Sequence, residues 1–517
     1  MAQQQSDNFQ TFDVLQNQLK NSWQDSEEFE TSDQDILVVP SFSIDQQVGQ
    51  NVPGFLHYEE RLLFSLIRLR NPHTRLIYVT AQPLAPLIID YYLQLLSGIP
   101  FSHARDRLLL ITTYDNSYKA LTQKILDRPR LVSKLRRALR PNKSHMICYN
   151  STELEKELSE KLQIPLFAAS PDLSYWGSKS GSRKVFELAN IPFPDGSQLV
   201  KTVEELVTVT AALWHRNPTL QRIVIKLNEG FSGEGNAVLD LRELPEVSTL
   251  GERQGAIANA FSHLSFQAAA ETWENFSSRI PELGAIAEAF IEGEIKRSPS
   301  VQGLILPSGK VEILSTHDQI LGGADGQIYL GCTFPAAADY RLELQTLGLK
   351  VGKVLAKQGA MERFGVDFVV TQRPDQTWDM QAIEINLRKG GTTHPLMTLK
   401  LLTNGQYDYN TGLFFTPQGQ EKYYIASDNL QKPQYKGLLP SDLMDIIAAH
   451  GLHFDSSTKT GTIFHLMGTL SEHGKLGLTS IGNSLSEAKA IYQQVEEVLD
   501  LETSGHYATS SNLPMTW

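Results

Sequence analysis

Two carboxylates and one amide are the residues whose types and spacing best fit a chemical site. Asp367 lies in the apolar run 364–370, and Glu384 and Asn386 lie two residues apart in the run 379–386. Because side chains alternate along a strand, Glu384 and Asn386 should share one face. The short turn between the two runs predicts a hairpin that brings Asp367 onto that face. Oxygen ligands of this kind suit Mg²⁺, which takes its remaining ligands from water and nucleotide phosphates; the alternative is a solvated polar face.

The register of this hairpin decides whether the three side chains meet. If Gln372 pairs with Thr377, Asp367 lies opposite Ala382, and a slip of one residue moves it to the other face. The opposite face of the hairpin is expected to be core, and it carries Val366, Phe368, Ile383 and Ile385.

An arginine and a glycine-rich helix start follow the second strand directly. Arg388 lies two residues beyond Asn386, where a guanidinium could neutralise a phosphoryl group in transfer. The glycines and threonines at 390–393 open a helix, and a helix N-terminus binds anions through its amides and its dipole. His394 could act as a base, but a histidine at a helix start beside Pro395 is more often structural.

A lysine beside a glycine-rich segment forms a second constellation. Lys226 lies at the end of the apolar strand 222–227 and is followed by NEGFSGEGN. A lysine next to backbone N–H groups that can turn toward an anion is a usual way to hold a polyphosphate. The GK[ST] ending of a Walker A loop is missing, and the alternative is an ordinary glycine-rich hairpin beside a surface lysine. The segment includes Gly230, Ser232, Gly233 and Gly235.

A strand that ends in acidic residues around a glycine spans 287–294. In an ATP site, the backbone of such an apolar hinge faces adenine, and a nearby carboxylate binds the ribose hydroxyls. Acidic residues at a strand end are more often simply exposed. The residues that would form this hinge are Glu288, Phe290, Ile291, Glu292 and Glu294.

The composition of the 517 residues is that of an ordinary globular protein and excludes several classes. Hydrophobic residues make up 41% and charged residues 20%, and no run of about 18 apolar residues occurs, so a transmembrane helix is excluded. A net charge of −12 without a basic stripe disfavours nucleic-acid binding. Cys148 and Cys332 lie far apart, so no disulfide framework or CxxC metal site is expected. The N-terminus lacks the features of a signal peptide, and we expect a cytoplasmic location without membrane attachment.

The patterns of strands and helices divide the chain into four parts. Residues 1–34 are polar and acidic, and we expect a flexible tail. Apolar strands alternate with helices over 35–164, which predicts a parallel sheet covered by helices. We therefore expect an α/β and α+β multidomain chain, with two subdomains in 165–414 and a small α+β domain in 415–517. The strands expected in the parallel sheet are Ile36–Val39, Leu76–Thr80, Leu108–Thr112 and His145–Tyr149.

The order of these elements resembles that of the ATP-grasp superfamily. Four elements follow one another over 165–405, about half of the chain. They are Ser178-Lys179 leading into a helix through Arg183–Ala189, the strand lysine with its glycine loop, the acidic hinge and a final Glu-x-Asn strand. IKLNEGFSGEGN, KRSPSVQG, GVDF and EINLRKGGTTHP look like the pheganomycin-type peptide ligase group of carboxylate–amine ligases, as does GKLGLTSIGNSLSEAKAIY near the C-terminus. The resemblance implies an ATP-grasp fold with an N-terminal parallel α/β domain and a small C-terminal α+β domain.

The resemblance also implies roles for individual residues. The hinge is shorter than the common family pattern, so the ribose ligand stays open between two glutamates. In chain order, the implied roles are Lys179 and Lys226 for the ATP phosphates, the loop 230–236 as their cover, Glu288 with the backbone of Phe290 and Ile291 for adenine, Glu292 or Glu294 for ribose, Asp367, Glu384 and Asn386 for Mg²⁺, and Arg388 for the transferred phosphoryl group.

The sequence thus predicts an ATP- and Mg²⁺-dependent, ADP-forming carbon–nitrogen ligase. It would join a small-molecule or peptide carboxylate to an amine through an acyl phosphate, with Lys226 and Arg388 as catalytic residues. Two alternatives stay open. One is an ATP-grasp carboxylase or nucleotide-pathway ligase with the same ATP site, and the other is a non-catalytic ATP-binding partner protein. The substrates and the oligomeric state, a homo-oligomer included, are not specified by the sequence.

Overall fold

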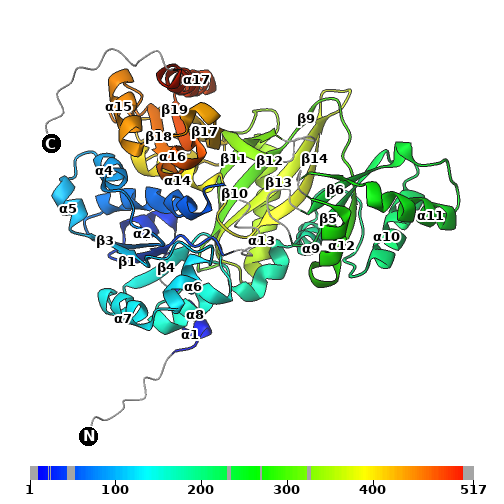
Figure 1. The fold of residues 1–517 in the computed structure, drawn as a ribbon, viewed down its shortest axis with the longest axis horizontal. Helices are drawn as coiled ribbons and strands as arrows, with labels where there is room; N and C mark the ends of the chain where they lie inside the picture. Colours follow the sequence, from blue (N-terminus) through cyan, green and yellow to red (C-terminus); the bar gives the residue numbers. More distant parts are fainter. Residues whose placement is uncertain are drawn as a thin grey trace, which may run out of the picture.

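The computed structural model describes residues 10–20, 23, 25–43, 53–229, 235–267, 271–322 and 328–504. Three parts can be followed in Figure 1: an N-terminal α/β unit in blue and cyan, a central sheet in green and yellow, and a green lobe at the right. The C-terminal elements, in orange and red, lie beside the N-terminal unit and continue the central sheet.

A parallel sheet of four strands forms the N-terminal unit, which confirms the prediction from alternating strands and helices. Successive residues of its central strand enter different cores: Ile36 and Val38 pack on one side, and Leu37 and Val39 on the other. In spatial order the strands are β3 (Leu108–Thr112), β2 (Arg75–Thr80), β1 (Asp35–Val39) and β4 (Ser144–Cys148). Its helices are the 3-10 helix η1 (Phe55–Arg70), α4 (Pro86–Gln94), α5 (Phe101–Arg105), α6 (Leu121–Leu126), α7 (Pro129–Ala138) and α8 (Glu153–Leu162).

Two short helices, α1 (Phe12–Leu19) and α2 (Ser26–Thr31), lie within the predicted N-terminal tail. Phe12, Leu15 and Leu19 of α1 are buried, whereas Val14 is exposed. Gln16 fixes this helix to the α/β unit, because its amide donates to the carbonyl of Leu166 at 2.8 Å and accepts from the N–H of Leu166 at 2.9 Å. Helix α1 therefore docks on the α/β unit, within the segment that was expected to be a flexible tail.

The lobe consists of an antiparallel sheet with helices on one face. Ile223, Ile225 and Leu227 of its central strand enter the core under these helices. Val224 and Lys226 alternate with them and therefore face the opposite way. In spatial order the strands are β7 (Ser265–Phe266), β6 (Asn236–Asp240), β5 (Arg222–Leu227) and β8 (Ala285–Ala289). The helices are α10 (Val203–Arg216), η3 (Leu241–Glu243), α11 (Leu250–Ala260), η4 (Phe261–His263) and α12 (Trp273–Leu283).

The central sheet has nine strands and holds the predicted metal ligands on its edge hairpin. The path of neighbouring strands is β14 (Trp378–Asn386), β13 (Glu362–Gln372), β10 (Pro299–Ile305), β11 (Val311–Gly322), β12 (Ile328–Phe334), β17 (Tyr423–Gln431), β19 (Lys475–Gly482) and β18 (Gly461–His465), while β9 (Lys296–Arg297) pairs with β13. Elements that pack on or near this sheet are η2 (Pro171–Gly177), α9 (Lys179–Ala189), α13 (Arg341–Lys357), α14 (Thr393–Thr403), β15 (Gln406–Asp408) and β16 (Leu413–Phe415).

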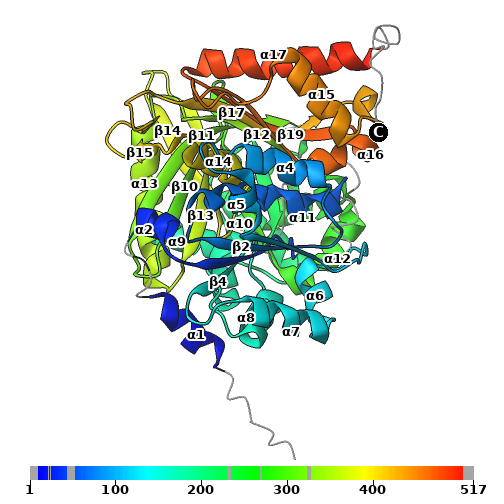
Figure 2. The same ribbon diagram turned by 90° about the vertical axis from the view of Figure 1, so that its left-hand side faces the viewer.

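The C-terminal unit shares both the sheet and the core of the rest of the chain. Strand β17, which follows the predicted boundary at 414/415, pairs with β12. One apolar core includes Leu62 of η1, Met397 of α14 and Leu478 of β19. Figure 2 shows α17 lying along the edge of the molecule above these strands. The remaining C-terminal elements are η5 (Pro433–Tyr435), α15 (Pro440–His450), η6 (Met467–Thr469), α16 (Leu470–His473) and α17 (Leu485–Thr503).

None of the described helices is both long and apolar enough to cross a lipid bilayer. The predicted division into domains at 34, 164 and 414 stays a prediction. Strands of one sheet and residues of one core lie on both sides of the last of these boundaries.

The hairpin of β13 and β14 forms with a register that differs from the predicted one. Gln372 pairs with Trp378 rather than with Thr377, because the connection between the strands is one residue longer than assumed. That shift alone would place the acidic side chains of the two strands on opposite faces.

A bulge in the hairpin restores the common face. Between Asp367 and Phe368 the register shifts again, so Asp367 lies opposite Glu384 instead of Ala382. The extra residue is Ile383, which lines a cavity and was wrongly expected in the core. The other three predicted core residues of the hairpin are buried, namely Val366, Phe368 and Ile385.

An aromatic ring packs directly against Gly303 of β10, so a substitution of this glycine tests how tightly the central sheet packs. A Cβ at Gly303 would lie 2.3 Å from the buried ring of Phe364. We expect Gly303→Ala to lower the free energy of unfolding by about 1–3 kcal/mol, because ring and strand must separate. Gly255→Ala, in the uncrowded interior of α11, should leave it unchanged or raise it by up to about 1 kcal/mol. Urea denaturation measures both changes, and equal stability of the two variants would contradict this packing.

Candidate active site

A cavity of roughly 660 Å³ lies between the lobe and the central sheet and extends to the N-terminal and C-terminal elements. Strands β5 and β8 of the lobe form one wall, and β10, β11, β13 and β14 of the central sheet form the other. The predicted site residues in its wall are Lys226, Glu288, Phe290, Ile291, Asp367, Glu384, Asn386 and Arg388. Residues from distant parts of the sequence therefore meet in one place.

Asp367 and Glu384 face each other across the β13–β14 pair. Burial, and then the charge of Glu384, raise the pKa of Asp367 to about 7, although nearby donors oppose the shift. Gln319 of β11 donates to Asp367 at 2.7 Å, and the Nζ of Lys179 lies 2.5 Å from Glu384. The two carboxylates thus attract cations and donors from two neighbouring elements.

Asn386 and Arg388 extend this network along the end of β14. The amide of Asn386 donates to Asp367 at 2.9 Å, and its oxygen accepts from Arg388 at 2.8 Å. The guanidinium of Arg388 therefore lies next to the carboxylates, as the predicted role beside a transferred phosphoryl group requires.

The oxygen atoms of this network fit a magnesium ion. Among the described residues, no group of three or more His, Cys, Asp or Glu side chains is arranged to hold a metal. Mg²⁺ in an ATP site needs fewer protein ligands, since phosphates and water complete its octahedron. The raised pKa of Asp367 indicates that its charge and that of Glu384 are incompletely compensated, which a divalent cation would correct.

Helix α9 connects the carboxylates with the lobe. Its first residue is Lys179, and Ser178 caps it by accepting from the N–H of Gly181. The N–H of Lys179 donates to the carbonyl of Asn228, just beyond β5, at 3.0 Å. Ser182, one turn further along, accepts from the N–H of Ile385 at 3.0 Å. The helix start is thus fixed between the two walls of the cavity.

Lys226 projects from β5 into the cavity and is buried. Its Nζ lies 2.5 Å from Glu288 of the neighbouring strand, and Arg183 of α9 donates to the same carboxylate at 2.8 Å. Although burial opposes it, these two cations hold the pKa of Glu288 below its usual value. The implied contact of Glu288 with adenine stays a prediction, and the carboxylate is engaged in positioning Lys226.

The hinge after β8 is divided between the cavity and the surface. Phe290 and Ile291 line the cavity, and the contact of their backbone with adenine stays a prediction. Glu292 lies outside its wall and forms a bidentate pair with Arg222, with distances of 2.9 and 2.5 Å. Glu294 is exposed. The role of either glutamate as a ribose ligand stays a prediction.

Most of the predicted phosphate loop lies outside the described residues, namely Gly230, Ser232 and Gly233. Gly235 is described and has a φ of 80°, a value that favours glycine. Its carbonyl accepts from the N–H of Leu227 at 2.8 Å, and the next residue, Asn236, begins β6 and lines the cavity. The described end of the loop therefore returns to the site.

The segment after β14 approaches the N-terminal unit. The N–H of Lys389 donates to the carbonyl of Tyr149 at 3.2 Å. A Cβ at Gly391 would lie 2.6 Å from the ring of Tyr329, so only glycine fits there. His394 is buried with its ring 4.0 Å from that of His465, and burial lowers its pKa well below the usual range. His394 is thus a buried, neutral ring outside the cavity wall, which favours the structural role expected of it.

Two functional side chains escaped the sequence reasoning. Gln319 lies on a strand in which nothing distinguished it from other polar residues. Arg183 lies four residues after Lys179, on the same face of α9, and this helical spacing was the available signal.

Comparisons with known proteins agree with this geometry. The IQCH-like ATP-grasp family matches residues 171–263 and 249–410, and the PGM1 C-terminal domain family matches residues 442–495. The chain is 28% identical over 476 residues to the L-propargylglycine–L-glutamate ligase of Streptantibioticus cattleyicolor, with 90% of this chain and 93% of that ligase covered. Residues 171–410 of this chain belong to the ATP-grasp superfamily. The relative of nearly equal length is a ligase, in agreement with the predicted enzyme class.

A second relative of this ATP-grasp chain is the IQ motif-containing protein H of Danio rerio. The identity is 22% over 91% of the chain but only 48% of that protein, so the chain spans about half of its length.

Solved structures confirm the predicted ATP-grasp fold. The biotin carboxylase of Campylobacter jejuni superposes with a TM-score of 0.52 at 12% identity, covering 91% of this chain and 94% of that one. The N5-carboxyaminoimidazole ribonucleotide synthetase purK gives 0.51 at 11% identity, with 90% and 96% covered. At this low sequence identity, the two similarities show a common fold and nothing about function.

The raised pKa of Asp367 predicts how Mg²⁺ binding responds to pH. Below a pKa of about 7 the carboxyl must lose its proton before it binds a cation, so the affinity should rise with pH by up to about tenfold per unit and level off above that pKa. Asp367→Asn should bind Mg²⁺ roughly 10–100-fold more weakly and lose this dependence.

Calorimetric titration of Mg²⁺ into the ADP-bound chain, over a series of pH values, measures both effects. The Asp367→Asn variant also corrects for protons that leave the nucleotide itself. An affinity with the same pH profile in both proteins would contradict the assignment of Asp367.

Proposed function

We propose that this ATP-grasp chain is an ADP-forming carboxylate–amine ligase that acts through an acyl phosphate. The observation that carries the proposal is the meeting, in one cavity, of Asp367, Glu384 and Asn386 with the cations Lys226 and Arg388. Hard oxygen ligands beside cations suit a nucleotide polyphosphate and its metal. The relative of nearly equal length, a ligase named for two amino acids, supports the same reaction class.

The first step transfers the γ-phosphoryl group of ATP to a carboxylate. A carboxylate oxygen attacks phosphorus, the bond to the β,γ-bridging oxygen breaks, and ADP leaves. Arg388 and Lys226 stabilise negative charge that moves from the nucleophile to the leaving group, and Glu288 holds Lys226 in place. Mg²⁺ held by Asp367, Glu384 and Asn386 would neutralise phosphate charge.

The second step forms the amide. The amine nitrogen attacks the carbonyl carbon of the acyl phosphate, the bond from that carbon to the phosphate oxygen breaks, and inorganic phosphate leaves. The neutral amine nitrogen loses one proton in the process, and the leaving phosphate accepts it. No covalent bond to the protein is required, so positioning and charge stabilisation supply the catalysis.

An ADP-release screen separates this function from its alternatives. Pairs of amino acids and short peptides should release ADP and give an amide that mass spectrometry detects. ADP release with bicarbonate alone would instead indicate a carboxylase. Binding of ATP without ADP release for any pair would indicate a non-catalytic ATP-binding protein, which has no need of an intact Asp367, Glu384, Asn386 and Arg388.

The metal site gives a direct test by substitution. Glu384→Gln keeps the size of the side chain but removes one anionic ligand, and we expect ADP release to fall at least about 100-fold. Asp379→Asn, on the same strand but paired with Arg373 away from the cavity, should retain normal turnover. Circular dichroism should show the same fold for both variants. Normal turnover of Glu384→Gln at low Mg²⁺ concentration would refute the metal assignment.

A further inference from the structure

The end of the cavity beyond Arg388 is formed by the N-terminal and C-terminal units together. It contains side chains that neither nucleotide nor metal binding uses. We call this end the junction pocket and define it by Tyr58, Arg61, Tyr149, Asp428 and Lys475. Tyr58 and Arg61 lie on η1, Tyr149 follows β4, Asp428 lies on β17, and Lys475 begins β19.

Lys475 is a buried cation without a counter-ion in the described part of the chain. Its side chain is only 3% exposed. The Nζ donates to the hydroxyl of Tyr58 at 2.9 Å and lies 5.2 Å from the centre of that ring, but no described carboxylate forms an ion pair with it. An ammonium group withdrawn from water in this way is costly unless an anion compensates it. Its position therefore indicates a negatively charged ligand.

Arg61 adds a second cation with spare hydrogen-bonding capacity. One arm of its guanidinium pairs with Asp428 at 2.5 Å, and the other donates to the hydroxyl of Tyr149 at 3.3 Å. Its Nε is buried and has no hydrogen-bond partner among the described residues. Although burial opposes it, the charge of Arg61 holds the pKa of Asp428 below its usual value. Asp428 forms its ion pair with Arg61, and the charge of Lys475 acts on it more weakly from a longer distance, so one carboxylate faces two cations.

The histidines behind the pocket do not change this balance. His465 is buried, and burial lowers its pKa to about 3, so its ring is neutral. The neighbouring His394 is neutral for the same reason. The junction pocket therefore contains two cations and one carboxylate, with room for one anionic group.

Tyr149 connects the junction pocket to the reacting end of the cavity. Its hydroxyl accepts from Arg61, and its carbonyl accepts from the N–H of Lys389, the residue after Arg388. A ligand anchored by its anionic group in the pocket would thus extend toward Arg388 and the carboxylates. This placement suits a substrate with two functional groups, one bound and one reacting.

We propose that the junction pocket binds the unreacting carboxylate of the amine substrate, through Lys475 and the Nε of Arg61. The inference rests on the ligase function proposed above. It specifies that the amine is supplied by an α-amino acid or a short peptide with a free carboxylate, and not by a simple amine. Neutral or esterified amines lack the group that compensates Lys475 and are excluded as good substrates.

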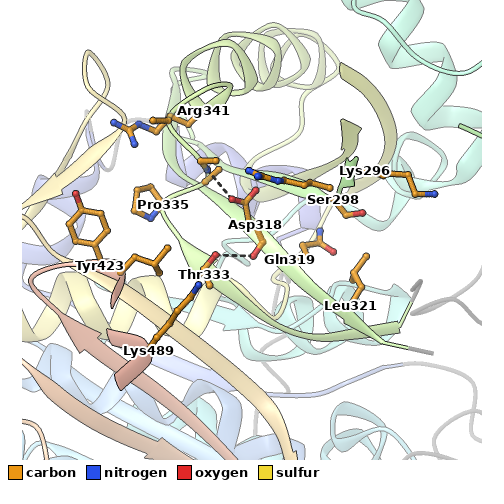
Figure 3. A pocket seen from close by; sticks show the side chains of 15 residues that line it. Lys296, Ser298, Asp318, Gln319, Leu321, Thr333, Pro335, Arg341, Tyr423 and Lys489 are labelled. Atoms are coloured by element: carbon orange, nitrogen blue, oxygen red, sulfur yellow. Dashed lines mark hydrogen bonds between the residues drawn. The ribbon is translucent and has the colours of Figure 1, made fainter. Parts of the chain in front are cut away.

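A second cationic hollow differs from the junction pocket in its exposure. Figure 3 shows Arg341 and Lys489 on either side of Asp318. Asp318 lies on the central sheet, close to the main cavity, whereas Arg341 and Lys489 belong to helices α13 and α17. Lys489 is exposed, Arg341 donates to the carbonyl of Thr411 at 3.0 Å, and Asp318 accepts from Tyr340 at 2.6 Å. These charges are solvated or already paired, so they do not require a ligand. Lys489 therefore serves as a matched control.

The test compares acids with their amides as amine substrates. L-alanine, L-glutamate and glycylglycine are each offered beside the corresponding C-terminal amide, with a mixture of amino acids as carboxylate donors. We expect the free acids to be used with a KM at least about 30-fold lower than that of the amides. Lys475→Gln should remove most of this preference while changing the KM for ATP less than about twofold. Lys489→Gln should leave both values unchanged.

Arg61→Lys provides a second variant, because it retains the pair with Asp428 but lacks the Nε donor. Its preference for acids should fall about tenfold. Equal use of acids and amides by the unchanged chain would overturn the proposal. So would a loss of affinity for the carboxylate donor alone, which would assign the pocket to the acyl substrate.

Failure of the ligase function can be told apart from failure of the pocket. If no pair releases ADP, thermal unfolding in the presence of Mg-ADP is measured with L-glutamate and with its diamide. Stabilisation by the acid alone, lost in Lys475→Gln, would support the pocket without the reaction. The same shift with both compounds, or with neither, would overturn it.

Discussion

Asp367 and Glu384 face each other across one strand pair, and two carboxylates so placed repel unless positive charge surrounds them. The neighbourhood is organised around this requirement. Lys179 and Arg388 bring cations from a helix start and a strand end, and Gln319 contributes a neutral donor. Each comes from a different element, so the site forms only when helix, hairpin and sheet are assembled. When metal and nucleotide bind, the metal would replace these side chains as the charge partner of the two carboxylates, and the phosphates would pair with the released cations.

The lobe contributes a second set of charges that obeys the same rule. Lys226 and Arg183 share the carboxylate of Glu288, which prevents an uncompensated charge in the buried wall. Arg183 and Lys179 lie on the same helix, so α9 joins the charge balance of the lobe to that of the hairpin. The C-terminal unit follows the rule less completely, since Lys475 lacks a described counter-ion. That difference distinguishes the junction pocket from the structural ion pairs of the lobe.

Local periodicity predicted the parallel N-terminal sheet and the convergence of Asp367, Glu384 and Asn386. The ATP-grasp fold was instead implied by the resemblance of the motifs over 165–405 to that superfamily. The sequence did not predict the register of the hairpin, since neither the bulge at Ile383 nor the length of the connection has a distinctive residue. Glu288 was interpreted as a ligand of adenine, yet its bonds to Lys226 and Arg183 depend on long-range packing. The junction pocket escaped prediction for the same reason, as its residues are about 400 positions apart in sequence, from Tyr58 to Lys475.

The pairing of β12 with β17 constrains how this chain could be divided or recombined. Four residues of β12, from Gly331 to Phe334, pair with β17, and a chain cut after residue 414 would leave their outward amides and carbonyls open. Such an open edge is a template for aggregation. The described residues 415–504 are therefore not an appended module that gene fusion could add or remove. They complete the sheet on which catalysis is built, and a shortened protein would lose solubility before it lost specificity.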